Sequence, residues 1–149
     1  MSFAKPSLKS RALRLLSVRE HSRSELERKL KGFEEEPGTL VRALDELQAK
    51  GFIDEQRVIE SVVHRRAAKL GAARIKQELQ GKGLDPEAVS EALAGLQATE
   101  RERALEVWRK KFGEPPTDAQ AAARQMRFLA SRGFGAETIR RVVAGAQDE

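Results

Sequence analysis

The sequence has no cysteine and no tyrosine, and aromatic residues make up only 5% of its 149 residues. Without cysteine the chain has neither a disulfide framework nor a thiolate metal site, and nothing ties it to an oxidising compartment. No apolar run approaches the roughly 20 residues that span a bilayer, and the first residues lead into charged ones without the apolar core of a signal peptide. We therefore expect a cytoplasmic protein that does not enter a membrane.

Motifs of common catalytic chemistry are also missing. Two histidines, His21 and His64, without HExxH spacing make no zinc site, and we expect both at the surface or at helix caps. There is no GxSxG elbow and no GxxxxGK[ST] phosphate loop. The acidic run at 34–36 lacks the alternating oxygen ligands of a calcium loop and is interpreted as a solvated loop. We predict a protein that is not an enzyme and uses no cofactor or metal.

Charge is abundant and unevenly distributed. Charged residues make up 34% of the chain, with a formal net charge of +5. Residues 9–31 hold eight basic and three acidic side chains, 34–55 hold two basic and seven acidic, and 64–82 hold six basic and one acidic. This alternation favours a patterned protein or nucleoprotein partner over a uniform DNA-binding stripe, although solvated helix faces with chance clustering explain the charges equally well.

The sequence repeats itself with a period of about fifty residues. An offset of 50 aligns residues 79, 83, 84, 89 and 93 with 129, 133, 134, 139 and 143, and an offset of 49 aligns 26, 30, 37, 40, 44 and 47 with 75, 79, 86, 89, 93 and 96. Three related units of this length would occupy the whole chain, as in helical repeat proteins. The spacing predicts an N-terminal tail at 1–8 and helical repeats at 9–53, 54–98 and 99–146.

Apolar spacings of three and four, together with capping signals, predict three helices in each unit. Capping boxes are expected at Ser22, Thr99 and Thr117, and Asp85 is expected to cap a helix that begins with Pro86. The expected helices are 9–20, 23–31, 38–50, 55–69, 72–81, 86–96, 100–112, 118–132 and 136–144. The fold class is therefore all-α, with three tandem three-helix units that resemble helix-turn-helix cores.

Candidate contact residues lie in the middle unit. Arg65, Lys69, Arg74 and Lys76 fall within twelve positions without an intervening acid. Arg65 and Lys69 are one helical turn apart, so we expect both to project from the same side of their helix, toward phosphates or acidic protein patches. The alternative contact surface is the basic stretch of Arg101, Arg103, Arg109, Lys110 and Lys111.

Arg66 and Arg127 both fall within apolar stretches of their predicted helices. The favoured interpretation is structural: each stem covers the core and each guanidinium pairs with a carboxylate, Asp54 or Glu55 in the case of Arg66. The other interpretation is that they anchor a partner. Both residues are therefore included among the candidates.

Several ordered segments resemble the RecX family of RecA regulators. The similar segments are RALRLLSVREHSRSELERKL at 11–30, LDELQAKGFIDEQR at 44–57, RRAAKLGAARIKQELQGKGL at 65–84, and WRKKFGEPP, RQMRFLASRGF and IRRVV in the last third. The resemblance spans nearly the whole chain. The first unit departs from the later two by its extra acidic residues after Gly32-Phe33, so its repeat boundary at 32–38 stays open.

The resemblance implies an elongated, curved array that binds RecA and the groove of its filament on DNA. It implies restraint of filament growth, ATP turnover, strand exchange and stimulated repressor cleavage. We expect a monomer with at most weak, non-specific contact with DNA. The alternative function is a helix-turn-helix nucleic-acid-binding protein. The helix at 72–81 weakens that alternative, because Gln77 and Gln80 are its only amide side chains for reading bases.

Overall fold

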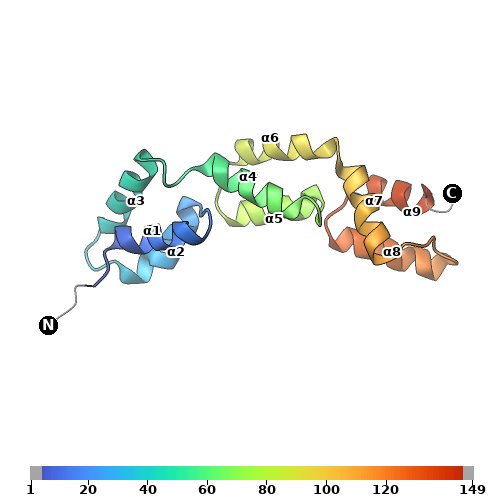
Figure 1. Ribbon diagram of the computed structural model, residues 1–149, viewed down its shortest axis with the longest axis horizontal. Helices are drawn as coiled ribbons and strands as arrows, with labels where there is room; N and C mark the ends of the chain where they lie inside the picture. Colours follow the sequence, from blue (N-terminus) through green and yellow to red (C-terminus); the bar gives the residue numbers. More distant parts are fainter. Residues whose placement is uncertain (1–4, 146–149) are drawn as a thin grey trace.

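The computed structural model describes residues 5–145, and all the regular secondary structure in these residues is helical. Figure 1 shows three lobes in a bowed row, with the two ends of the chain at opposite ends of the molecule. The elements are α1 (Leu8–Val18), α2 (Arg23–Leu30), the 3-10 turn η1 (Lys31–Phe33), α3 (Thr39–Ala49), α4 (Glu55–Arg66), α5 (Ala72–Gly81), α6 (Pro86–Gln97), α7 (Glu100–Lys111), α8 (Ala119–Ser131) and α9 (Ala136–Gly145). The predicted all-α repeat fold is confirmed.

Each lobe has its own small apolar core, built from the residues that the repeat aligns. Leu26, Ile75, Leu79 and Leu129 are all fully buried. Leu44, Leu93 and Val143 occupy equivalent places in the three cores. A helix buries one stripe of residues, so the repeating apolar positions mark the inward face of each helix. The precise ends of the units, including 146, which lies outside the described residues, stay a prediction.

Of the three expected capping boxes, the one at Ser22 formed and those at Thr99 and Thr117 did not. The capping box at Ser22 is confirmed. At Thr99 the hydroxyl makes no capping bond, and Asp118 rather than Thr117 caps α8 by accepting from the backbone N–H of Ala121 at 2.7 Å.

His21 is buried, against the expectation of a surface or cap position. Its ring is 2% exposed, with Nδ1 3.0 Å from the carbonyl oxygen of Arg19 and Nε2 3.0 Å from Nζ of Lys29. Burial lowers the pKa of His21 from its usual value. A neutral ring that donates from Nδ1 and accepts at Nε2 satisfies both neighbours.

Two helices without a capping side chain of their own receive one from elsewhere. Gly38 and Gly71 precede α3 and α5. The Glu34 carboxylate accepts from the backbone N–H of Leu40 at 2.8 Å, and the Glu100 carboxylate accepts from that of Ala72 at 2.8 Å. An anionic acceptor suits the positive end of a helix. Glu34 is therefore part of the fold and not of a purely solvated loop.

The first and middle units meet where the start of α2 faces the turn after α5. The Ser22 hydroxyl donates to the carbonyl oxygen of Lys82 at 2.6 Å, and Arg28 donates to that of Gly81 at 3.0 Å. The Glu25 carboxylate lies 3.2 Å from Nζ of Lys82 and 2.6 Å from the Arg19 guanidinium. We call this contact the first junction. Side chains form it, through hydrogen bonds to backbone carbonyl oxygens and through an ion pair.

The middle and third units meet in the equivalent place, where the start of α5 faces the turn after α8. Gly71 donates from its backbone to the carbonyl oxygen of Arg132 at 2.8 Å, and Arg74 donates to that of Ser131 at 2.7 Å. A Cβ on Gly71 would overlap the backbone of Gly133, so only glycine permits this approach. We call this contact the second junction. Gly71 is thus the residue that precedes the first residue of α5 at this contact.

Candidate partner-binding surface

The predicted contact residues surround the end of α4. That helix ends at Arg66, three residues earlier than expected, and residues 67–69 form a turn. His64, Arg65 and Arg66 occupy its last turn, where positive charge is favourable because the helix dipole is negative there. Lys69 therefore lies in the turn and not on a continuing helix face.

Arg103 of α7 binds the backbone of this turn. Its Nη1 donates to the carbonyl oxygens of Ala67 and Leu70, both at 2.8 Å, and its Nη2 donates to that of Leu96 at 3.2 Å. Burial lowers the pKa of Arg103, while the nearby Glu100 carboxylate raises it. Arg103, one of the alternative contact residues, therefore joins the middle and third units.

Arg66 pairs with a carboxylate, but with a different one from those expected. Its Nε lies 3.0 Å from Oε1 of Glu78 on α5, and neither Asp54 nor Glu55 is its partner. The pair is formed through Nε alone, and the Arg66 side chain is 44% exposed. Arg66 therefore has a carboxylate partner, as the structural interpretation expected, but the residue is exposed and its role as an anchor for a partner stays a prediction.

Arg74 is committed to the second junction. Besides donating to Ser131, its backbone nitrogen and the start of its side chain lie against Gly133, where any Cβ would overlap them. It is exposed overall, but its guanidinium has an intramolecular acceptor. Replacing Arg74 would therefore disturb the array as well as any partner contact.

The remaining candidates point into solvent. Arg65, Lys69, Lys76 and Arg127 are all exposed, and none makes a side-chain hydrogen bond or ion pair with another residue in the described part, 5–145. Arg127 lies on α8 one helical turn before Ser131, whose carbonyl Arg74 contacts. Arg127 of the third unit thus borders the second junction, and the expectation that it covers the core and pairs with a carboxylate was wrong.

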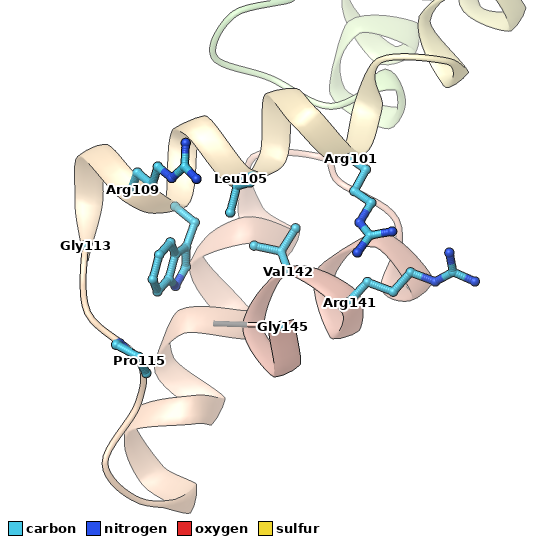
Figure 2. Close-up of a pocket in the computed structure, with 9 residues that line it drawn as sticks. Arg101, Leu105, Arg109, Gly113, Pro115, Arg141, Val142 and Gly145 are labelled. Atoms are coloured by element: carbon cyan, nitrogen blue, oxygen red, sulfur yellow. The ribbon is translucent and has the colours of Figure 1, made fainter. Parts of the chain in front are cut away.

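Sequence reasoning missed a hollow in the third unit between α7 and α9. It has a volume of about 530 Å³ and is lined by residues from α7, the following loop and α9: Arg101, Leu105, Trp108, Arg109, Gly113, Pro115, Arg141, Val142 and Gly145. Figure 2 shows Arg101 and Arg141 together at one end and Arg109 at the other, with Leu105 and Val142 between them. We call this hollow the α7–α9 groove. Arg101 and Arg109 were among the alternative contacts, but no local pattern indicated that Arg141 lies beside them.

Three family models match the chain in order and together span most of it. The first, second and third three-helix domains of RecX match residues 9–47, 54–93 and 99–143. The chain belongs to the RecX family. This confirms the resemblance inferred from the ordered sequence segments.

Individual relatives agree with this assignment. The regulatory protein RecX of Leptothrix cholodnii is 52% identical over 96% of this chain and 91% of its own length. That of Herbaspirillum seropedicae is 49% identical over 90% of this chain and 87% of its own length. The crystal structure of RecX from Lactobacillus salivarius matches with a TM-score of 0.76 at 20% identity, over 95% of this chain and 96% of that one, and thus supports the fold. No helix described here is long and apolar enough to cross a membrane.

Proposed function

We propose that this chain is a non-enzymatic regulator that binds the RecA recombinase and its filament on DNA. In this role it restrains filament growth, ATP turnover, strand exchange and stimulated repressor cleavage. The ordered match of all three RecX domains supports the proposal, because it covers the whole repeat array and does not rest on one short motif. We further propose that it acts in the cytoplasm as a monomer.

We propose that the contact surface includes Arg65, Lys69 and Lys76, with Arg66 and Arg127 beside them. These cations are exposed, and all but Arg66 have no intramolecular side-chain partner among residues 5–145 to compete with a filament. Lys69 lies two residues before Gly71, and Arg127 one helical turn before Ser131, so both are close to the second junction. A patterned array of cations suits a periodic partner with acidic patches or phosphates. Arg74 contributes by holding that junction.

The sequence-specific DNA-binding alternative loses support at α5. A recognition helix reads bases with its N-terminal residues. The start of α5 is instead packed against the third unit, with Gly71 and Arg74 both bonded to backbone carbonyls there. Weak contact with phosphates through exposed lysines is compatible with the same surface.

The activity test is ATP hydrolysis by RecA on single-stranded DNA. We expect this chain to lower the rate at sub-stoichiometric amounts while hydrolysing no ATP itself. Inhibition below equimolar amounts is expected because a protein lodged in a filament affects many neighbouring subunits. An unchanged rate at equimolar protein would contradict the proposal.

The surface test reverses three cations at once. A single exposed charge pair is worth under about 1 kcal/mol, whereas several reversals add repulsion across the contact. We expect Arg65→Glu, Lys69→Glu and Lys76→Glu together to abolish inhibition while helix content, measured by circular dichroism, is kept. The matched control is Arg14→Glu, Lys31→Glu and Arg42→Glu, which changes three exposed cations of the first unit by the same total charge. Equal inhibition by both folded variants would move the contact elsewhere.

A further inference from the structure

The α7–α9 groove is lined by three arginines, of which only two have an acidic partner in their own unit. None of its nine lining residues is acidic. The Arg101 side chain makes no hydrogen bond or ion pair with any residue in 5–145, and that of Arg109 only approaches Glu106 at 3.9 Å. Arg141 shares Glu137 with Arg140 and is still 58% exposed. Three arginines therefore line a hollow that has no acidic side chain in its wall.

The floor of the groove is apolar and held in place. Leu105 and Val142 lie between the arginines in Figure 2, and Trp108 lines the hollow while being only 5% exposed. The Trp108 indole donates to Oε1 of Gln125 at 2.8 Å, and Nε2 of Gln125 donates to the carbonyl oxygen of Glu114 at 3.1 Å. This chain of bonds ties the loop after α7 to α8. The groove is thus formed before any partner arrives, which lowers the entropic cost of binding.

We propose that the α7–α9 groove binds an acidic peptide segment of a protein partner, with an apolar side chain between two carboxylates. One carboxylate is held by Arg101 and Arg141, the apolar side chain rests on Leu105 and Val142, and the second carboxylate is held by Arg109. Guanidinium groups suit this task because their planar forks pair with carboxylates. The proposal does not depend on RecA being the protein that supplies the segment.

The geometry also sets the spacing of the two acids. Arg101 and Arg109 are eight positions apart on α7, which is about 12 Å along a helix. An extended peptide rises about 3.3 Å per residue, so the two acids should be about four residues apart. The sequence Glu-Ser-Leu-Ser-Glu meets this requirement and puts the apolar residue at the centre.

A peptide fits the groove better than single-stranded nucleic acid does. Proteins that bind single strands stack bases on exposed aromatic faces along a continuous basic track. Here the one aromatic lining residue, Trp108, is buried, and the arginines surround a short hollow. An aliphatic floor accepts a leucine-like side chain instead.

The test is an amide NMR titration of the whole chain with a peptide that contains Glu-Ser-Leu-Ser-Glu. We expect saturable shifts in α7 and α9, and at least about tenfold weaker binding by the Arg101→Glu, Arg141→Glu variant, because reversal turns attraction into repulsion. The control variant Arg14→Glu, Arg42→Glu changes exposed cations of the first unit and should bind within about twofold of the unaltered chain. Spectra of the free variants show whether each is folded.

Two further peptides and an oligonucleotide separate the parts of the proposal. Gln-Ser-Leu-Ser-Gln should lose most of the affinity because it lacks charge, and Glu-Ser-Ser-Ser-Glu should lose part of it because it lacks the apolar side chain. Equal binding of all three peptides, or equal weakening by both double variants, would overturn the proposal. The proposal would also be overturned if oligothymidylate shifted the amide resonances of the groove residues while the acidic peptide did not. Inhibition of RecA is measured separately, so failure here leaves that proposal standing.

Discussion

The two junctions use the same geometry with different chemistry. In each, the start of the second helix of one unit meets the turn after the second helix of the next. In the first junction a hydroxyl and a buried carboxylate make the contact, through Ser22 and Glu25. In the second the backbones themselves touch, because Gly71 and Gly133 have no side chains there.

This difference shows how one repeat can be stacked in two ways. A charged contact pays a desolvation cost that must be offset by good geometry, and it depends on pH. A backbone contact is independent of pH but tolerates almost no added volume. The Glu25 carboxyl illustrates the first case: burial raises its pKa, but bonds from Arg19, the backbone N–H of Ser22 and Lys82 outweigh this and lower it to about 2.

The largest expected effect on stability comes from placing a serine, the residue that Ser22 supplies at the first junction, at Gly71 of the second. In the Gly71→Ser variant, the added Cβ would overlap the carbonyl group of Gly133, which is backbone and cannot rotate away. We expect a loss of about 4 kcal/mol in the free energy of unfolding, measured by urea denaturation. The control Gly95→Ala, within α6 and with open space around it, should gain about 0.5–1 kcal/mol. Equal stability of both variants would show that the backbone contact is not needed.

A second, smaller effect compares the equivalent glycines of the two turns. A Cβ at Gly133 would lie 2.6 Å from the backbone nitrogen of Arg74, whereas one at Gly83 would meet the Ser24 hydroxyl, which can rotate away, and the Ser24 Cβ at 2.9 Å, which needs only a small shift. Both positions have positive φ, 91° and 68°, so each alanine variant also bears a backbone cost of about 1 kcal/mol. We expect Gly133→Ala to lose about 3 kcal/mol and Gly83→Ala about 1 kcal/mol. Equal losses in thermal denaturation would remove the proposed difference between the junctions.

The smallest effect is the pH dependence of the first junction. Because the folded-state pKa of Glu25 is lowered from 4.5 to about 2, its stabilisation is complete above pH 4.5 and is lost as the pH falls toward 2. We expect about 2 kcal/mol of acid-dependent stability from this group, after allowing for solvent around the 35% exposed Arg19. Glu25→Gln should flatten the stability profile in that range, as seen by denaturation at several pH values. The control Glu27→Gln, whose carboxylate is 47% exposed against 7% for Glu25, should keep the profile of the unaltered chain.

Much of the fold could be predicted because periodicity and helix ends are local signals. The aligned apolar positions formed the three cores, and the box at Ser22 and the cap at Asp85 formed as expected. The errors came from competition that local patterns do not contain. Thr99 lost its capping role because its hydroxyl bonds the carbonyl oxygen of Leu96 and accepts from Arg103.

The candidate surface was predictable only as a set of charges. Sequence spacing placed cations in the middle unit but could not tell free ones from occupied ones. The structure commits Arg66 to Glu78, Arg74 to Ser131 and Arg103 to the turn after α4. Each of these partners is at least twelve positions away, where helical periodicity has no predictive power.

By itself, the sequence determined the helices, the repeat and the family, because these follow from local spacing and from residue identities along the chain. Only the tertiary structure decided how the units meet. The approach of Gly71 to Gly133, the capping of α5 by Glu100 and the meeting of Arg101 with Arg141 join segments that are distant in sequence. Such contacts depend on how whole units pack, and packing is set by shape in three dimensions and not by the pattern of any one helix.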